Sequence, residues 1–319
     1  MDHLIFAGFT GLCGFARGYW DLVAYRTVAG LGLGGEFGIG MALAAEAWTA
    51  SKRARVSSYV ALGWQAGVLA AAFVTSVLLP VVGWRGMFLL GLLPAVIAFV
   101  VRRTLDEPEI FVNKHAAKKE NSFRLLVKDR KTRRATLGIA ILCSVQLLGY
   151  YGIMIWMPSC LANSVGLSLT KSGMWTSATV LGGALGAWTF GQLADRVGRR
   201  PMFILFQISA MLMVFLYSRI TAPNMVLWVG AIMGIFVTGM GAGIGALISE
   251  AYLTAARATA QNVLFNFGRA VGGMGPLVIG TLLTMYSVNS AIALLASIYA
   301  LAIVATVFLI PELKGKELD

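Results

Sequence analysis

The feature of this sequence that most limits its fold is a succession of long apolar runs separated by short polar segments. An α-helix rises about 1.5 Å per residue, so roughly 20 apolar residues cross the hydrocarbon core of a bilayer. Lipid offers no hydrogen bonds to the backbone, whereas a helix satisfies its own backbone groups. We therefore predict an all-α integral membrane protein with about ten transmembrane helices. The expected spans are residues 22–45, 56–81, 87–101, 135–157, 175–193, 202–217, 225–248, 260–285 and 291–310, preceded by a shorter apolar run at residues 4–16.

Basic residues fall between the apolar runs and set the expected orientation. The chain has a net charge of +12, although only 13% of its residues are charged. Lys and Arg concentrate in residues 102–134, which we interpret as a cytoplasmic linker, and the C-terminus falls on the same side. The basic residues do not interleave with aromatic residues on a polar surface, as they do in many nucleic-acid-binding proteins. We therefore expect a protein of the cell (inner or plasma) membrane that has no nucleic-acid partner.

Residue types that carry enzymatic chemistry are scattered along the chain. The cysteines, Cys13, Cys143 and Cys160, lie in or beside apolar runs, and the two histidines lie at the N-terminus and in the basic linker. Their spacing is not typical of a metal site, a disulfide framework or a nucleophile with its base. We expect no enzymatic activity, no catalytic residue, no metal site and no cofactor.

The parts of the chain on either side of the linker repeat one another. The segment AEAW at 45–48 corresponds to SEAY at 249–252, and an arginine follows the glutamate of each segment by seven residues. Such a repeat predicts two bundles related by an axis along the membrane normal, formed by residues 1–101 and 135–319. If the repeat is in register, the run that contains Glu46 is the fourth helix of its bundle. We therefore expect that the first two helices are missing, that residues 1–101 hold helices 3–6, and that residues 135–319 hold helices 7–12.

A loop motif carries a family resemblance. Residues 191–200 read GQLADRVGRR and resemble the signature loop of the major facilitator superfamily. Residues 26–38, 83–88, 266–276 and 311–315 resemble the proton-coupled sialate and metabolite symporters of that superfamily. The resemblance implies the major facilitator fold, with about ten of its twelve helices present in this sequence, and transport by alternating access. It also implies that the loop is a conformational latch, a role that we assign to Asp195 and Arg196.

Two repeated charge pairs are candidates for gating. Glu46 and Arg53 stand at the end of one span, and Glu250 and Arg257 stand at the equivalent place in the second half. We interpret these residues as charges that pair between helices in one conformation and separate in the other. Direct contact with substrate is the alternative.

The run at 22–45 carries ionisable residues at positions where charge is expensive, which makes them functional candidates by default. Arg26 and Glu36 are separated by about 15 Å along the helix axis, so they do not form a simple pair. Glu36 has no counterpart in the second half and is our candidate for the proton-coupling residue; a packing carboxylate is the alternative. Arg26 is assigned a structural role, with anion binding as the alternative. Glycines recur every four residues along the same run and predict close approach of a neighbouring helix.

A second intramembrane cation, Arg269, lies in a span rich in amide side chains. A guanidinium in such surroundings suits a carboxylate substrate, and pairing with backbone carbonyls of another helix is the alternative. Aromatic and amide residues of other spans complete a candidate solute site, although such residues also serve in packing. The substrate-binding candidates are Arg269, Asn266, Asn262, Gln146, Tyr150 and Gln65.

Together these observations predict a secondary active transporter. The resemblance implies proton-coupled symport of a small organic anion or sugar acid by alternating access. The expected partners are the solute, protons and the lipid bilayer, and we expect a monomer. The alternative is a truncated fragment that does not transport, or a membrane sensor or assembly protein built on the same fold.

Overall fold

The computed structural model describes residues 2–93, 122–164, 169–220 and 222–316. Within these ranges the chain forms helices and short 3-10 turns and contains no β-strand. In chain order the elements are α1 (Asp2–Leu12), η1 (Cys13–Phe15), α2 (Tyr19–Glu46), η2 (Ala50–Lys52), α3 (Arg53–Leu90), α6 (Ser122–Leu125), α7 (Arg130–Ser164), α8 (Leu169–Val197), α9 (Arg199–Tyr217), α10 (Pro223–Gly239), η3 (Met240–Gly243), α11 (Ile244–Ala251), α12 (Thr254–Gly273), α13 (Gly275–Met285) and α14 (Val288–Leu309).

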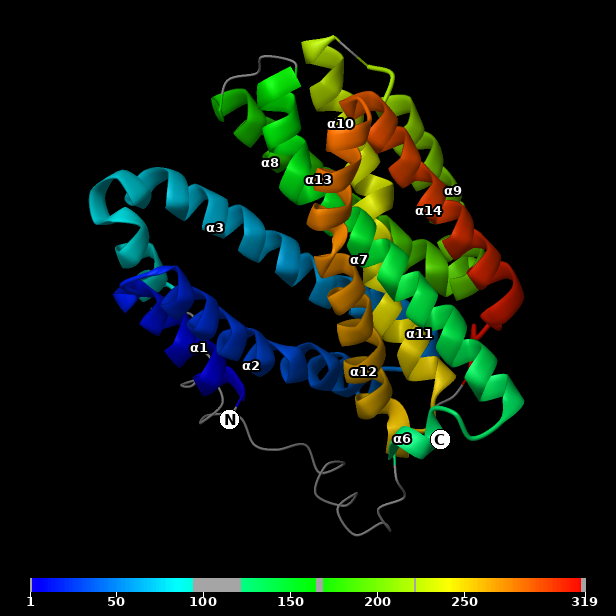
Figure 1. Ribbon diagram of the computed structural model, residues 1–319. Coiled ribbons are helices and arrows are strands. Elements are labelled where there is room, and N and C mark those ends of the chain that lie inside the picture. The colour runs from blue at the N-terminus through cyan, green and yellow to red at the C-terminus, as the bar shows by residue number, and fades with distance from the viewer. Residues whose placement is uncertain (1, 94–121, 165–168, 221, 317–319) are drawn as a thin grey trace.

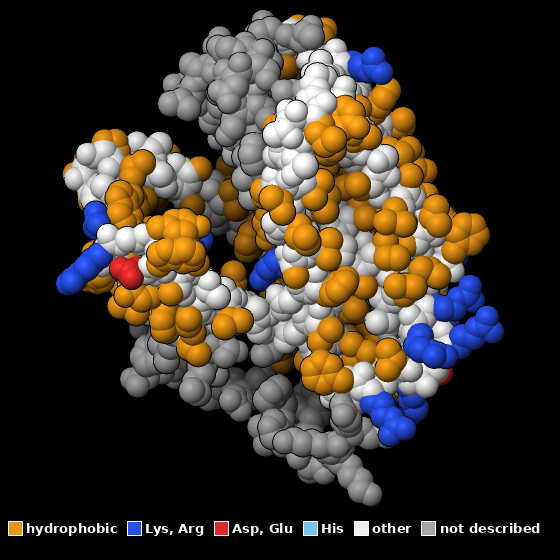
Figure 2. All heavy atoms as spheres, viewed as in Figure 1, with side chains coloured by type: hydrophobic (Ala, Val, Ile, Leu, Met, Phe, Trp, Pro, Cys, Tyr) orange, Lys and Arg blue, Asp and Glu red, His pale blue; other side chains and the backbone are white. Residues whose placement is uncertain are grey.

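The helices have the length and surface of membrane spans. Seven helical segments in the described ranges are long and apolar enough to cross a bilayer. Large apolar side chains point outward, among them Phe73, Trp228 and Phe308, which are each at least 70% exposed. Figure 2 shows apolar side chains over much of the visible surface, with the charged ones gathered in a few places. Soluble proteins rarely expose apolar surface on this scale, so the prediction of an all-α integral membrane protein is confirmed.

The helices form two groups of unequal size. Helices α7 to α14 pack into one bundle, and α1, α2 and α3 form a smaller group beside it (Figure 1). The smaller group contacts the bundle chiefly through α2 against α12 and through α3 against α8. The predicted domains 1–101 and 135–319 contain these two groups, and their division at a linker stays a prediction because residues 94–121 lie outside the described part.

The end of the predicted linker is helical. Helix α7 begins at Arg130, several residues before the expected start of its span. The Asp129 carboxylate explains this early start, because it accepts hydrogen bonds from the Thr132 backbone nitrogen at 2.8 Å and from the Thr132 hydroxyl at 3.0 Å. A side chain that satisfies a free N–H group stabilises the first turn of a helix.

Glycines allow the closest helix contacts inside the bundle. A Cβ atom at Gly239 of α10 would lie 2.6 Å from the carbonyl carbon of Gly186 in α8, and one at Gly230 would lie 3.0 Å from Cδ1 of Trp175. Side chains at these positions would separate α8 from α10. Small residues bring helix backbones together in membranes, where burial from water contributes little to association.

Two of the expected apolar runs are divided in the structure, and one division expected between runs is present. Gly83 in α3 has a positive φ of 65°, which agrees with the expected division between residues 81 and 87. The runs at 225–248 and 260–285, expected as single spans, are each divided: η3 separates α10 from α11, and Met274 separates α12 from α13. Both divisions lie where glycines are dense, and Pro276 follows the second one, so the sequence weakens the helix there.

Candidate functional site

A cavity lies at the boundary between the smaller helix group and the bundle. Together with the open space at its mouth it measures about 630 Å³. Figure 2 shows the molecule hollowed between the two groups, with a basic side chain visible in the hollow. The lining residues are Phe37 of α2; Ala61, Trp64 and Gln65 of α3; Gln146, Leu147, Tyr150 and Tyr151 of α7; Ala187 of α8; Thr238 of α10; Gly241 and Ala242 of η3; and Phe265 and Arg269 of α12.

Arg269 is the one charged residue among the described residues that line this cavity. Its guanidinium carbon lies 5.1 Å from the centre of the Phe265 ring, and that ring stacks on Phe37 with centroids 4.1 Å apart. An aromatic face stabilises a cation only in part, and the buried Nε of Arg269 has no hydrogen-bond partner in the described ranges. The arrangement therefore offers a charged donor to an anion that enters the cavity.

Polar groups without charge lie around the rest of the cavity. Gln65 and Gln146 are only 3% and 5% exposed, and the Oε1 atom of Gln65 and the Oγ1 atom of Thr238 have no partner among the described residues. The indole nitrogen of Trp64 donates to the Tyr150 hydroxyl at 3.4 Å. Aromatic walls with a few convergent polar groups are typical of sites for organic solutes.

The other two substrate-binding candidates, Asn262 and Asn266, lie where α12 contacts α2 and do not line the cavity. The side-chain nitrogen of Asn266 donates to the Gly34 carbonyl at 2.6 Å and to the Asn262 carbonyl at 2.9 Å. A Cβ atom at Gly38 would lie 2.8 Å from the Asn262 backbone nitrogen. The glycines of α2 thus permit the expected close approach of a neighbouring helix, which is α12.

The candidates Arg26 and Glu36 both lie on α2. The Arg26 side chain is exposed, and its guanidinium carbon lies 5.9 Å from the centre of the Phe88 ring. The Glu36 side chain lies outside the described part of the structure, so its proton-coupling role stays a prediction.

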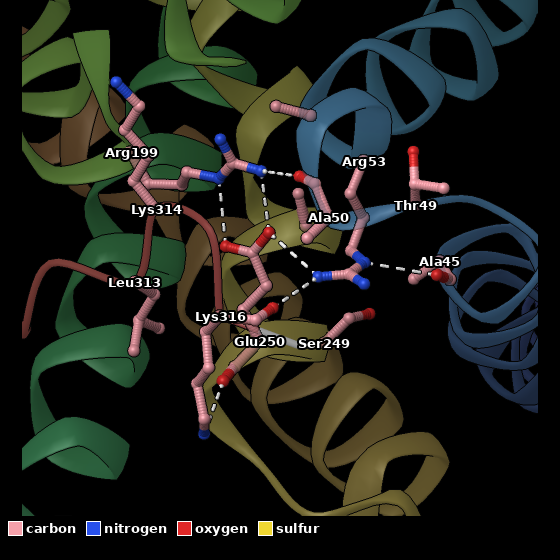
Figure 3. A network of polar contacts seen from close by, with 12 residues as sticks. Ala45, Thr49, Ala50, Arg53, Arg199, Ser249, Glu250, Leu313, Lys314 and Lys316 are labelled. Atoms are coloured by element: carbon pink, nitrogen blue, oxygen red, sulfur yellow. Dashed lines mark hydrogen bonds and ion pairs between the residues drawn. The ribbon is translucent and has the colours of Figure 1, made fainter. Parts of the chain in front are cut away.

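A network of charged residues lies on the same boundary, next to the start of α3 (Figure 3). At its centre, the fully buried Glu250 carboxylate accepts hydrogen bonds from Arg199 Nε at 2.9 Å and Arg199 Nη2 at 2.7 Å. Arg53 of α3 donates to the same carboxylate at 3.3 Å. Glu250 therefore joins the smaller group to the bundle. We call this network the latch, and its residues are Glu46, Arg53, Asp195, Arg199, Glu250 and Arg257.

Each glutamate of the repeat pairs with the arginine of the other repeat, across the boundary between the two groups. Arg257 of α12 donates to the Glu46 carboxylate of α2 at 2.7 Å, just as Arg53 of α3 donates to Glu250 of α11. Each arginine also donates through Nε to the carbonyl of the residue before the glutamate of its own repeat, at 3.2 Å for Arg53 and 3.0 Å for Arg257. The predicted duplication thus appears as two equivalent contacts, each running across the boundary.

The signature loop meets the start of α3. The Asp195 carboxylate accepts hydrogen bonds from the backbone nitrogens of Ala54 at 3.2 Å and Arg55 at 3.1 Å, and it pairs with Arg199 at 3.2 Å. A carboxylate at the N-terminus of a helix is favoured by the helix dipole. Burial raises the pKa of the Asp195 carboxyl above its ordinary value, and the Arg199 guanidinium acts in the opposite direction.

The loop arginines differ in what they contact. The Arg196 side chain is exposed, and its backbone carbonyl accepts a hydrogen bond from Lys314. Arg199, which the sequence analysis does not single out, is buried and carries two ion pairs. Its place in the Gly-Arg-Arg ending of the loop motif, residues 198–200, is the signal that points to it.

A buried contact between the two groups lies between the latch and the cavity. The Ser57 hydroxyl donates to the Ala242 carbonyl at 2.6 Å, and the Ala246 backbone nitrogen donates to the Ser57 oxygen at 3.3 Å. Ser57 lies between the latch residue Arg53 and the cavity residue Ala61 along α3. Helix α3 therefore contacts the bundle at the latch and again at Ser57, before it reaches the cavity.

Comparison with known proteins agrees with this architecture. The sequence profile of the Major Facilitator Superfamily matches residues 3–168 and 139–318. A relative from Haemophilus influenzae, described as a metabolite transport protein, is 60% identical over 99% of this chain and 80% of its own length. The sialic acid transporter NanX of Escherichia coli is 26% identical over 87% of this chain and 68% of its own length.

A solved structure shows the same fold. The proton:xylose symporter XylE bound to 6-bromo-6-deoxy-D-glucose has a TM-score of 0.77 and 16% identity, over 99% of this chain and 80% of that chain. The profile match, the strong relative and the shared fold lead to one conclusion: this chain belongs to the Major Facilitator Superfamily and is an integral membrane transporter of small metabolites, not an enzyme.

Proposed function

We propose that this protein is a secondary active transporter that carries a small organic anion or sugar acid together with protons. The observation that carries the proposal is Arg269, whose guanidinium is the one charge lining the cavity in the described ranges. An ionisable group in a membrane core is costly unless it is paired. A carboxylate substrate would supply the missing countercharge.

The rest of the cavity supports an organic solute of moderate size. Trp64, Tyr150 and Phe265 offer apolar faces to a carbon skeleton, and Gln65, with its unpaired oxygen, offers an acceptor to a hydroxyl or amine. The sialic acid transporter among the relatives fits this class, because sialic acid carries a carboxylate and several hydroxyls.

The latch supports alternating access. Two of its ion pairs, Arg53–Glu250 and Arg257–Glu46, cross the boundary between the two helix groups, and all of their side chains except Glu46 are buried, so these pairs favour one arrangement of the groups. Separation of the groups at this end would break those pairs and open the cavity toward the latch. The positive-inside rule supports the proposal that this end, the linker and the C-terminus face the cytoplasm. The proposal also takes the protein to be a monomer in the cell membrane.

Proton coupling completes the proposal, with Glu36 as the protonation site. The XylE neighbour is a proton symporter, and Glu36 is a carboxylate on α2, the helix that also supplies Phe37 to the cavity. Uptake by purified protein in liposomes should rise when the outside is made acidic. If collapse of the proton gradient and the Glu36→Gln substitution both leave uptake unchanged, the coupling is wrong.

The substrate class is tested by measuring uptake of a panel of solutes into liposomes that contain the parent protein or the Arg269→Gln variant. The panel contains sialic acid, simple organic acids and the uncharged sugar xylose. Loss of a charged hydrogen bond of 1.5–3 kcal/mol should raise the KM for an accepted acid by about 10- to 100-fold. Arg269→Lys should recover part of the loss, because it keeps the charge but not the planar fork.

A matched control is Arg219→Gln. Arg219 also lies over a phenylalanine ring, with its guanidinium carbon 5.1 Å from the centre of Phe215, but it is outside the cavity. We expect this variant to transport as the parent does. Uptake of xylose in preference to every acid in the panel would contradict the proposal that Arg269 selects a carboxylate.

A further inference from the structure

A second cavity lies where α7 and α9 begin and α14 ends. Its lining includes four basic residues and, within the described part of the chain, no acidic residue. Figure 2 shows Lys and Arg side chains gathered at this end of the bundle. The basic residues are Arg130, Lys131 and Arg134 of α7 and Arg200 of α9, and the apolar wall is formed by Val307, Phe308, Leu309, Ile310 and Pro311.

The positive charge of this cavity is not neutralised by the residues around it. Arg130, Lys131 and Arg134 form no ion pair with any residue in the described ranges. The guanidinium of Arg200 donates to the Val307 carbonyl, which carries no net charge. Arg130, Lys131 and Arg134 are exposed, so water screens part of the repulsion among the four cations, and an anion between them would relieve the rest.

Two carboxylates beside the cavity, Asp129 and Glu312, already accept hydrogen bonds. The Asp129 carboxylate caps α7 through Thr132, as described above. The Glu312 carboxylate accepts hydrogen bonds from the backbone nitrogens of Arg199 and Arg200, both at 3.0 Å, and so neutralises the N-terminus of α9. Neither carboxylate forms an ion pair with the four basic residues among the described residues, so the basic side chains keep their capacity to bind an added anion.

An apolar groove continues from the basic cavity along α9. Arg200 lines both, and the groove is also lined by Pro201, Ile204, Leu205 and Ile208, with Glu312 beside Arg200 at its charged end. Residues 200, 204 and 208 are four apart and share one face of the helix. Leu205 and Ile208 are 51% and 39% exposed. The groove thus leads from the charged helix ends onto the lipid-facing surface.

We propose that the basic cavity and the groove together bind one anionic phospholipid. The phosphate of the headgroup lies among the four basic side chains, and an acyl chain follows α9 over Ile204 and Ile208. A free phosphate would gain the charge contacts but leave the groove unused, and a zwitterionic lipid would fill the groove but bring its own cation to the basic side chains. The combination selects an amphiphile with net negative charge.

The test measures lipid binding to the purified full-length protein. Protein stripped of lipid in detergent is titrated with phosphatidylglycerol, and bound lipid is counted by native mass spectrometry. Each basic residue near an anionic lipid contributes about 1 kcal/mol, or roughly fivefold in affinity. The Arg130→Gln/Arg134→Gln variant should therefore bind phosphatidylglycerol about 25-fold more weakly than the parent.

The matched control is Arg124→Gln/Arg133→Gln, which removes the same charge from the same end of the molecule but from residues that do not line the cavity. This control should bind as the parent does. Circular dichroism shows whether each variant keeps its helices, and Lys131→Gln provides a milder variant if the double substitution does not fold.

Three outcomes would overturn the proposal. The first is equal weakening by the test and control variants, which would show only a general effect of charge. The second is equal affinity for phosphatidylcholine and phosphatidylglycerol. The third is displacement of bound phosphatidylglycerol by inorganic phosphate at equal concentration, which would identify a site for a free anion.

Discussion

The latch and the cavity lie on the same boundary, and they differ in how their buried polar atoms are satisfied. In the latch, the Glu250 carboxylate receives hydrogen bonds from Arg199 and Arg53. In the cavity, polar atoms of Gln65, Thr238 and Arg269 have no partner among the described residues. A buried polar atom without a partner costs about 1–3 kcal/mol. The Glu250 carboxylate is therefore satisfied without any ligand, whereas the cavity keeps hydrogen-bonding capacity that a solute can use.

The largest expected effect comes from breaking the latch at its centre. Glu250→Gln leaves two arginines beside a neutral side chain in a fully buried place, and breaking a buried ion pair costs about 3–5 kcal/mol. The equivalent Glu46→Gln substitution should cost less, because the Glu46 side chain is 18% exposed and water solvates what remains. Thermal unfolding of both purified variants measures the difference.

A second measurement separates opening of the latch from general loss of stability. Ser57 is only 5% exposed in the structure, so a thiol introduced by Ser57→Cys should react slowly with a soluble maleimide. Adding Glu250→Gln should speed this reaction at temperatures well below unfolding. Unchanged labelling together with equal stability losses in the two glutamate variants would show that Glu250 is not the centre of the latch.

The second prediction concerns the contact of α2 with α12, which places Phe37 in the cavity. Gly38→Val should destabilise the protein by about 1–3 kcal/mol, because the new side chain overlaps Asn262 and forces the helices apart. Gly30→Val is the control, since no atom lies within 4 Å of a Cβ atom built there. Transport should fall with Gly38→Val alone. Similar behaviour of the two variants would mean that the close approach of α2 does not shape the cavity.

Much of the fold is predictable from the sequence, because the length of an apolar run and the demands of lipid leave few choices besides a helix. The breaks inside the spans are not predicted. The apolar pattern continues through Met240–Gly243 and past Met274, and a hydropathy reading therefore sees single long helices. Glycine and proline mark both places, but glycine is also frequent in unbroken helices that pack closely, such as α8.

The sequence predicts which types of residue form the candidate site better than it predicts which residues contact one another. The seven-residue spacing indicates that Glu46 and Glu250 act with arginines, yet the pairs run between the helix groups, and a single sequence does not say which helices meet. Four of the substrate-binding candidates, Arg269, Gln146, Tyr150 and Gln65, line the cavity. Their binding of solute stays a prediction, as does the role of Glu36. Phe37 and Thr238 resemble many other positions in apolar runs, so only the folded chain places them at the site.

The smallest expected effect is also the sharpest test of the contrast between the two regions. Gln65→Met keeps the size of a side chain that lines the cavity but removes its unpaired oxygen. If a solute uses this oxygen, its KM should rise about fivefold, the effect of one neutral hydrogen bond of about 1 kcal/mol. Stability should be unchanged or slightly higher, because the substitution removes a buried polar atom that lacks a partner.

Gln207→Met is the matched control for this substitution. Gln207 is also buried and also has an unpaired oxygen, but its nitrogen donates to Thr306 at 2.9 Å and it lies outside the cavity. Its substitution should leave KM unchanged and lower the unfolding temperature, since the Thr306 hydroxyl loses a partner. Comparison of KM and unfolding temperature for the two variants thus distinguishes a polar side chain that binds solute from one that stabilises packing. A stability loss at Gln65 with unchanged KM would place that side chain in the second class.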